Sequence, residues 1–472
     1  MLVTVGLMMV TTGLPAWIVL IGVALVSSLV GLAAGAFTWP LLTALPSRVL
    51  GLLENDLLQA MPLYVFMGAL LNRLPLADIL LRVGERAFSR TGAGAPLAGL
   101  GLGVVLAPMN GSVGAGIAML TRTVLPRLTA SGMPLERGAA LVTVSSTLGV
   151  VIPPSLVLIL LSEAMLRAHT EALNVTHAAV RIVNTQDIFR GALVPACILL
   201  LLCVLVAWVT GAQKPQPRST RVAPSPADLV TAALTLAFIL GLLAAVTLGY
   251  LYAVEAAATG GVTLFTLALA TGTLKFSVLK EVLRDTMVVT GALFALLIGA
   301  TVFTLIVRAF GTDRWVMSLL AGSATAGIYG PLLAVMLTLG LCAFVLDAFE
   351  MTFVVVPVLI PPLLMRVPDA TWVAVLTLLI LQTSFLIPPF GYAVLMLRNR
   401  LGGRLDAGRF VRALLPYLIA QLAVLALILT FPNLLWHDSA TLVAPASGGL
   451  SDQEIDELLR RQTEPDDRAR AK

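Results

Sequence analysis

Charged residues are scarce in this sequence of 472 residues. Asp, Glu, Lys and Arg make up 12% of the chain and hydrophobic residues make up 58%, whereas a soluble domain carries about 25% charged residues. Many apolar stretches reach the roughly 18 to 20 residues that a helix needs to cross a bilayer. These features exclude soluble enzymes, nucleic-acid binders and disordered proteins. They indicate an all-α polytopic membrane protein surrounded by lipid.

Cysteine and histidine are also rare, with three of each. The cysteines lie in apolar runs, and we expect buried thiols that act as small hydrophobes and form no disulfides: Cys197, Cys203 and Cys342. The histidines lack the spacing of metal ligands: His169, His177 and His437. No Walker A, H-E-x-x-H or G-x-S-x-G motif occurs, so we expect no ATP site, no hydrolytic activity and no cofactor.

Charge is distributed unevenly along the chain. Lys and Arg total 30 against 25 for Asp and Glu, a formal charge of +5, and five arginines fall between Arg398 and Arg412. By the positive-inside rule, this cluster predicts a cytoplasmic loop. The apolar start, Met1 to Thr12, has no basic region and no small-residue cleavage site. We interpret it as the first turns of a membrane helix that breaks at Gly13 to Pro15.

Hydropathy predicts about 10–12 transmembrane helices. Two apolar regions, 93–128 and 331–365, are interrupted by Pro, Gly and polar residues, and we expect two re-entrant helical hairpins there. The other candidate spans are 16–36, 57–72, 139–161, 189–211, 229–247, 249–271, 286–309, 371–396 and 410–432.

Landmarks in the two halves of the chain match in order and spacing. The offsets between paired landmarks are 299 − 68 = 231, 347 − 110 = 237 and 388 − 153 = 235. We therefore predict two structural repeats of inverted topology, separated by a Pro-rich linker. The predicted parts are a first repeat 1–212 (arm helix 46–58, hairpin 93–128, broken helix 139–161), the linker 213–228, a second repeat 229–435 (arm helix 275–285, hairpin 331–365, broken helix 371–396) and a polar tail 436–472.

Each predicted broken helix contains a Pro-Pro pair within an apolar run. Proline removes a backbone donor and clashes with the preceding turn, so two in succession unwind a helix. The freed carbonyls can coordinate a cation, and the N-terminus of the following half-helix can bind an anion. Matching interrupted helices in two halves are typical of the binding site of a secondary transporter.

Two carboxylates, Asp347 and Glu350, lie in an otherwise apolar stretch. A charge at membrane depth costs roughly 2.5 kcal/mol or more, so such a residue is a functional candidate. The structural alternatives are a carboxylate that faces water at a hairpin tip, or one paired with an arginine such as Arg308. For Glu255 we prefer a purely structural role at a helix N-terminus.

Hydroxyl, amide and backbone oxygens accompany these carboxylates at matching positions in both halves. Together with one carboxylate, such oxygens suit a hard monovalent cation such as Na⁺. The candidate cation-binding residues are Asn110, Gly111, Ser112, Ser145, Ser146, Thr147, Gly149, Asp347, Thr383 and Ser384.

The stretch Ser146 to Ser155 resembles the T-L-G-x-x-I-P-P-S signature of one transporter family. Met61 to Gly68, Glu255 to Ala258, the Asp347 hairpin and Ile387 to Gly391 support the likeness in the expected order. From about residue 2 to 435, the chain resembles the large membrane (permease) subunit of tripartite ATP-independent periplasmic (TRAP) transporters, the DctM-like family.

The resemblance implies a multi-pass symporter of the bacterial inner membrane, driven by Na⁺ or less often by H⁺, with an elevator mechanism. It implies import of a carboxylate-bearing solute from a periplasmic solute-binding protein, together with a small four-helix membrane subunit. Asn110 to Ser112 with Ser145 to Gly149 would frame one cation site, and Asp347 with Thr383 and Ser384 a second. Substrate would lie between the hairpin tips, near the broken-helix residues Pro153, Pro154, Ser155, Glu350, Pro388, Pro389 and Gly391.

Some residues depart from the family pattern. Val113 and Gly114 follow Ser112 where the family often has a second serine, Glu350 is not a family residue and would make coupling more proton-like, and 167–186 is an insertion without an assigned role. Two alternatives remain open. One is a one-component Na⁺/dicarboxylate symporter of related fold, although its Ser-Asn-Thr tips are absent. The other is a non-transporting membrane scaffold or channel.

Overall fold

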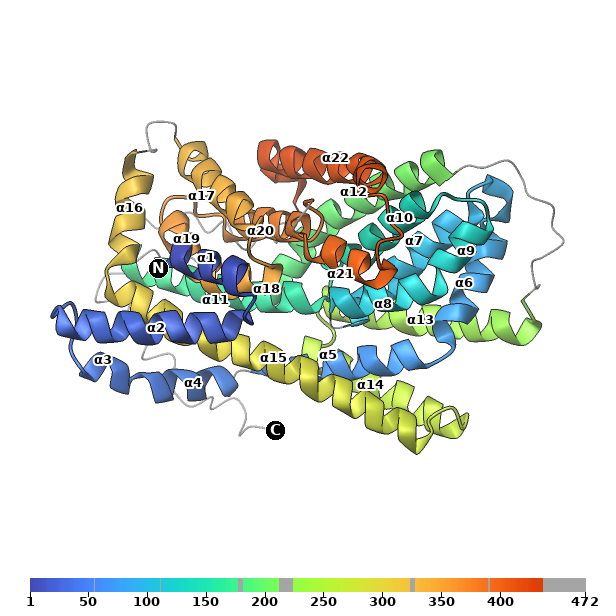
Figure 1. Cartoon of the computed structure of the whole chain (residues 1–472), viewed down its shortest axis with the longest axis horizontal. Helices are drawn as coiled ribbons and strands as arrows, with labels where there is room; N and C mark the ends of the chain where they lie inside the picture. The colour runs from blue at the N-terminus through green and yellow to red at the C-terminus, as the bar shows by residue number, and fades with distance from the viewer. Residues whose placement is uncertain are drawn as a thin grey trace, which may run out of the picture.

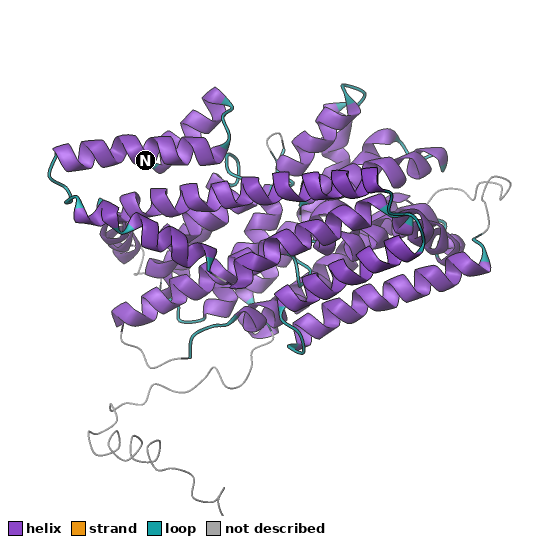
Figure 2. Cartoon of the chain, turned by 90° about the horizontal axis from the view of Figure 1, so that it is seen from below, coloured by secondary structure: helices purple, strands orange, loops and turns teal. Residues whose placement is uncertain are grey.

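The computed structural model describes residues 1–54, 56–110, 112–176, 181–211, 224–322, 327–388 and 391–435. Across these ranges every regular element is a helix (Figure 2), which confirms the expected all-α class. Several predictions fall outside the described residues. They concern Gly111, Pro389, His177, His437, most of the linker and the polar tail.

The helices follow one another along the chain as Figure 1 shows. Those of the first half are α1 (Leu2–Thr12), α2 (Ala16–Ala33), α3 (Pro40–Thr43), α4 (Leu45–Leu53), α5 (Asp56–Arg73), α6 (Leu76–Ala87), η1 (Ser89–Thr91), α7 (Gly94–Leu106), η2 (Ala107–Asn110), α8 (Val113–Thr123), α9 (Leu125–Ala130), α10 (Leu135–Leu148), α11 (Leu156–Thr176) and α12 (Thr185–Gly211). Those of the second half are α13 (Pro226–Leu248), α14 (Ala253–Ala270), α15 (Phe276–Ala309), α16 (Thr312–Gly322), α17 (Tyr329–Cys342), α18 (Ala348–Glu350), the π-helix η5 (Met351–Val355), α19 (Val356–Leu364), α20 (Ala370–Ser384), α21 (Tyr392–Leu401), α22 (Ala407–Thr430) and η6 (Pro432–Leu434).

Six helices in the described part of the chain are long and apolar enough to cross a membrane: α2, α12, α13, α14, α15 and α22. α5 and α6 form a seventh candidate that bends by 66° at a short break. The count is below the expected 10–12 because other apolar helices of the described chain have only 10–17 residues, which is shorter than a single span requires. Large apolar side chains such as Leu201, Leu205 and Val209 of α12 are exposed, which fits a lipid environment.

The centre of the molecule is formed by α20 and α10. All residues of α20 are buried, and α10 is buried from Gly138 to its end. Both helices lead into a Pro-Pro pair, so the interrupted helices lie at the core of the fold. Because they are enclosed by protein, their irregular backbone does not have to face hydrocarbon.

Long helices form one edge of the molecule, where α2, α14 and α15 lie in Figure 1. α15 packs along α2, and α5 contacts both α14 and α15. Arg73 at the end of α5 pairs with Glu281 and with Asp285 (2.9 Å) of α15. The pairs tie the two halves of the chain together at this edge.

The expected second arm, 275–285, is not a separate helix. It is the first part of α15, which runs without interruption from Phe276 to Ala309. No proline or glycine occurs between Phe276 and Thr290, so nothing in the local sequence breaks the helix. The first arm differs, because α4 ends at Leu53 before α5 begins.

Smaller expectations can also be compared with the structure. Gly13 adopts a left-handed conformation (φ 64°) at the end of α1, at the expected break. Glu255 accepts the backbone N–H of Tyr252 (2.8 Å) in the first turn of α14, a role at a helix N-terminus. The cysteines are free thiols, but only Cys203 is buried; Cys197 is exposed because it lies on an outward face of α12.

The Arg-rich segment expected to be a cytoplasmic loop is mostly helical. Arg398 and Arg400 lie in α21, Arg409 and Arg412 lie in α22, and Arg404 lies in the connection between the two helices. Asp406 caps α22 by accepting the backbone N–H of Arg409 (3.0 Å). This hydrogen bond holds the pKa of the Asp406 carboxyl below its usual value. The loop is therefore a well-capped helix connection, and its orientation in the membrane stays a prediction.

Candidate functional site

The first helix break lies between α10 and α11. Pro153 and Pro154 carry no N–H, so the helical hydrogen-bond ladder stops there. Ser155 then caps α11: its hydroxyl donates to the carbonyl of Val150 (2.7 Å) and accepts the N–H of Leu158 (3.1 Å). The break is thus a defined turn, and α11 begins directly after it.

The second break lies between α20 and α21. The carbonyl of Thr383 accepts the N–H of Leu386 (2.9 Å), which closes the last turn before Pro388. A Cβ placed on Gly391 would lie 2.6 Å from the carbonyl oxygen of Phe385. Only glycine fits at Gly391, because the chain folds back closely on itself after the break.

The two broken helices meet in the core. The Gln382 amide donates to the hydroxyl oxygen of Thr147 (3.1 Å), and both side chains are fully buried. The Thr147 hydroxyl itself donates to the carbonyl of Val144 (3.0 Å), which fixes the direction of the bond. Gln382 and Thr147 are 235 positions apart, the same offset as Pro388 and Pro153. The predicted repeat stays a prediction, but its matching positions are in contact.

The tip of the first hairpin rests on the first break. A Cβ placed on Gly149 would lie 2.5 Å from the backbone of Ala107 and 2.6 Å from that of Pro108. On the other side of this hairpin, a Cβ on Gly114 would lie 3.1 Å from the hydroxyl of Tyr392 in α21. The first hairpin is therefore wedged between the two broken helices.

The candidate hydroxyl groups near the breaks share one arrangement. Each donates its proton to a backbone carbonyl three or four residues earlier, at 2.6–3.0 Å. A hydroxyl that has donated its proton keeps lone pairs that can face a cation. The residues are Ser145, Ser146, Thr147, Thr383 and Ser384.

A small cavity of about 20 Å³ lies at the junction of the first hairpin and the first break. Ser112, Ser146, Gly149 and Ser155 line it from the first half of the chain, and Phe349 lines it from the second. A cavity needs about 10–15 Å³ to hold one water molecule. The space therefore suits a single particle of that size, and the three serines add hydroxyl groups to a lining that is otherwise mostly apolar.

Of the predicted first cation set, the structure gathers only a part around this cavity. The four residues named above line it, with Ser155 drawn from the predicted substrate set. Ser145 and Thr147 lie on α10 beside it but are not in its lining. For Asn110 only the backbone, at the end of η2, is described.

Asp347 and Glu350 form two reciprocal hydrogen bonds at the tip of the second hairpin. Asp347 accepts the backbone N–H of Glu350 (2.8 Å), and Glu350 accepts the backbone N–H of Asp347 (3.0 Å). Within the described ranges neither carboxylate belongs to an ion pair. Arg308, the alternative partner, binds Glu171 (2.7 Å) and the carbonyl of Pro357 (2.6 Å). The hairpin tip therefore presents two carboxylates next to the start of a π-helix, an element frequent at functional sites.

The second predicted cation set is only partly assembled. α18, which Asp347 caps, packs against α20, the helix that ends with Thr383 and Ser384. The three residues thus belong to neighbouring elements, without a hydrogen bond between them in the part of the chain described. Pro388 is half-buried beyond the end of α20.

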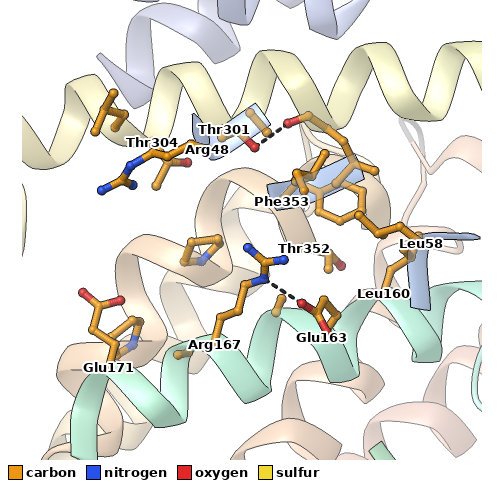
Figure 3. Close-up of a pocket in the computed structure, with 18 of the residues that line it drawn as sticks. Arg48, Leu58, Leu160, Glu163, Arg167, Glu171, Thr301, Thr304, Thr352 and Phe353 are labelled. Atoms are coloured by element: carbon orange, nitrogen blue, oxygen red, sulfur yellow. Dashed lines mark hydrogen bonds and ion pairs between the residues drawn. The ribbon is translucent and has the colours of Figure 1, made fainter. Parts of the chain in front are cut away.

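A larger cavity of about 180 Å³ lies between α4, α11, α15 and the second hairpin. Figure 3 shows α11 on one side, carrying Glu163, Arg167 and Glu171, with Arg48 and Thr304 on the other. Arg167 pairs with Glu163 (2.7 Å) one turn away on α11. The sequence reasoning did not predict this cavity, because its walls come from five separate segments.

An apolar wall separates the two cavities. Phe349 lines the small cavity and Phe353 lines the large one, one helical turn apart. Both pack against a buried cluster that is distinct from the main core. The cluster consists of Leu52, Leu58, Met61, Val65, Leu156, Leu160, Leu293 and Leu297.

Residues 167–186, the unassigned insertion, divide into two described parts. The first continues α11 to Thr176. After it, Arg181 pairs with Asp187 (2.6 Å), and His169 accepts the backbone N–H of Val183 (3.0 Å). The insertion is thus held by local bonds at the start of α12. Among the described residues, no group of three His, Cys, Asp or Glu side chains could hold a metal ion.

Sequence reasoning passed over two site residues. Gln382 is not among the predicted site residues, although its offset from Thr147 equals that of the proline pairs and could have identified it. Phe349 gave no signal, because an aromatic residue in an apolar run usually packs in the core.

Comparison with known proteins gives one family over nearly the whole chain. Residues 3–434 match the family described as "Tripartite ATP-independent periplasmic transporter, DctM component". The chain is 24% identical over 159 residues to the C4-dicarboxylate TRAP transporter large permease protein DctM of Rhodobacter capsulatus, covering 33% of this chain and 35% of that protein. It is 20% identical over 406 residues to the sialic acid TRAP transporter permease protein SiaT of Haemophilus influenzae, covering 84% and 62%. The matches therefore span less than two thirds of each relative.

Two solved structures share the fold. The Alcanivorax borkumensis YdaH transporter superposes with a TM-score of 0.57 at 17% identity, over 83% of this chain and 88% of that one. The Neisseria gonorrhoeae protein MtrF superposes with a TM-score of 0.52 at 12% identity, over 83% of each chain. At these identities the likeness concerns the arrangement of helices.

Proposed function

Because this chain belongs to the DctM component family of tripartite ATP-independent periplasmic transporters, we propose that it couples the import of a carboxylate-bearing solute to the entry of Na⁺. It is a multi-pass membrane subunit of such a transporter, and its family is a family of permeases. The observation that carries the proposal is the bond between Gln382 and Thr147, which joins the two helix breaks close to a cavity that three serines help to line.

The small cavity is the proposed first cation site. Ser112, Ser146 and Ser155 supply hydroxyl oxygens, and the break at Gly149 supplies backbone carbonyls. Oxygen donors without a fixed negative charge suit a monovalent cation better than a divalent one. Asn110 and Gly111 belong to the proposed ligand set through the family resemblance alone.

Asp347 is the proposed carboxylate of a second cation site, together with Thr383 and Ser384. Asp347 is half-buried between apolar helices, and a cation or a proton that offsets its charge would stabilise a carboxylate there. Glu350 lies next to it, held in the same pair of hydrogen bonds. Two adjacent carboxylates can share one cation or one proton. If transport is coupled to H⁺, Glu350 would be the residue that takes part in binding the proton.

The proposed solute site adjoins these cation sites between the hairpin tips, near the residues of the helix breaks. Helix N-termini attract anions, and two helices, α8 and α11, begin at this junction. A bound cation beside an anionic solute would neutralise part of its charge. Cation and solute would then bind together better than either binds alone, which is the physical basis of symport.

We further propose an elevator movement. The hairpins and broken helices would shift as one body along the edge formed by α2, α14 and α15. In support, the broken helices pack closely against the first hairpin, at Gly149 against the backbone of Ala107 and at Gly114 against the hydroxyl of Tyr392. The proposed partners are a small four-helix membrane subunit and a periplasmic solute-binding protein, in the bacterial inner membrane.

Reconstitution into proteoliposomes tests the proposal. Uptake of a labelled carboxylate should require an inward Na⁺ gradient, the small subunit and the loaded binding protein together. Uptake by this chain alone would favour a one-component symporter. Ion conductance without solute uptake would favour a channel, and either result would overturn the proposal.

A further inference from the structure

The large cavity carries a charge imbalance that the proposed cation sites do not explain. Five charged side chains line it. Arg167 pairs with Glu163, and Arg308 pairs with Glu171. Arg48 is the fifth, and within the described residues it forms no ion pair. The cavity therefore has an excess positive charge on one guanidinium, which is exposed.

The wall nearest to Arg48 in the sequence is apolar. Leu52 lies one turn further along α4, and Leu58 follows at the start of α5. Leu160 and Phe353 continue this surface from α11 and the second hairpin. A ligand in the cavity would thus meet a cation at one end and hydrocarbon along its body.

One hydroxyl group of the lining residues has no hydrogen-bond acceptor among the described residues. Thr301 and Thr352 donate theirs to backbone carbonyls at 2.8 and 2.7 Å. The hydroxyl of Thr304 is buried and has no hydrogen-bond partner among the described residues. Figure 3 places Thr304 on the same side of the cavity as Arg48. A buried hydroxyl without a partner costs free energy that a ligand oxygen would recover.

We propose that the large cavity binds a small monocarboxylate with an apolar body, whose carboxylate pairs with Arg48 and accepts the hydroxyl of Thr304. The inference rests on the proposed function: this cavity would be a binding site for the solute in addition to the proposed site between the hairpin tips, and its lining would specify the solute class. Guanidinium groups match carboxylates in shape as well as charge. The chain would take such a solute in this cavity, one apolar wall away from the small cavity.

The same lining disfavours a dicarboxylate. The other two arginines are already committed to Glu163 and Glu171, so a second carboxylate would find no uncommitted cation in the described lining. It would instead lie among leucines or near those glutamates. Burial of an unpaired charge is costly. The C4-dicarboxylate named for a relative at 24% identity need not be the solute of this chain.

Equilibrium binding to the purified chain tests the assignment directly. The probes are radiolabelled 4-methylpentanoate, succinate and the uncharged 4-methylpentan-1-ol, each with NaCl present. We expect 4-methylpentanoate to bind and the other two to bind at least about tenfold more weakly, since one charged hydrogen bond is worth about 1.5–3 kcal/mol.

Two variants locate the site. Arg48→Gln should weaken binding of 4-methylpentanoate about tenfold or more, and Thr304→Val about threefold. The matched control is Arg400→Gln, on an exposed arginine of α21 outside the cavity, which should bind as the wild type does.

Three results would overturn the inference: unchanged binding in Arg48→Gln, tighter binding of succinate than of 4-methylpentanoate, or binding of neither acid by the wild type. These failures are separable from failure of the proposed function. A wild type that binds 4-methylpentanoate at Arg48 but shows no Na⁺-driven uptake with its partners would overturn the transport proposal and leave the site assignment standing.

Discussion

Replacement of Thr147 by valine tests the contact between the two helix breaks. Valine has nearly the same shape as threonine but cannot accept the Gln382 amide, which is 3.1 Å away in a fully buried position. A buried donor left without a partner costs about 1–3 kcal/mol. We therefore expect Thr147→Val to lower the free energy of unfolding by that amount.

A matched control separates this effect from the loss of a hydroxyl. Thr143 lies one turn earlier in α10, is also fully buried, and donates only to the carbonyl of Ala139 (2.9 Å). Thr143→Val removes the same chemical group without leaving another side chain unpaired. It should cost less than about 1 kcal/mol, because the freed carbonyl still accepts a helix hydrogen bond.

The double-mutant cycle completes the test. In Gln382→Leu the amide is gone, so adding Thr147→Val should cost little, and the two changes should couple by about 0.5–3 kcal/mol. The measurements are unfolding in mixed detergent micelles, followed by Trp fluorescence, and Na⁺-driven uptake with the partners present. Additive effects, or equal losses in Thr147→Val and Thr143→Val, would refute a bond between the breaks.

Two further predictions concern the site. Gly149→Ala should abolish uptake and lower stability by about 1–3 kcal/mol, because its Cβ would lie 2.5 Å from the backbone of Ala107. The control Gly241→Ala, whose Cβ would have nothing within 4 Å, should be neutral or stabilising in thermal unfolding. Equal behaviour of the two variants would contradict the packing at Gly149. Asp347→Asn should abolish or uncouple uptake while expression persists, because asparagine still caps a helix but carries no charge. Asp406→Asn, at an exposed cap, should transport normally, and wild-type coupled uptake in Asp347→Asn would remove that carboxylate from the mechanism.

Local sequence rules were sufficient to predict most helices and the two breaks. The predicted Pro-Pro breaks lie where α10 and α20 are followed by new helices, because proline removes a backbone donor from the helical ladder. Local sequence alone does not decide this outcome for every pair, since Pro361 and Pro362 lie inside α19. The second arm was not predictable in this way. The charged residues at 275–285 predicted an arm helix ahead of the span 286–309, but without a proline or glycine in that segment α15 continues through both.

The candidate site was likewise only partly predictable from the sequence. Hydroxyl and carboxylate candidates could be selected from the sequence, because polar groups in apolar runs are rare and costly. Which of them share a cavity could not be selected. Ser155 lines the small cavity with Ser112, whereas Ser145 does not, and this depends on how the first hairpin packs against the break.

By itself, the sequence determined that this protein lies in a membrane, is helical and interrupts its helices at paired prolines, since hydropathy and proline chemistry act within a few residues. Only the tertiary structure decided that Gln382 meets Thr147 across 235 positions, and that Arg48 faces a cavity beside two glutamates that other arginines already neutralise. Contacts between distant segments depend on the packing of whole helices, and no local pattern specifies that packing.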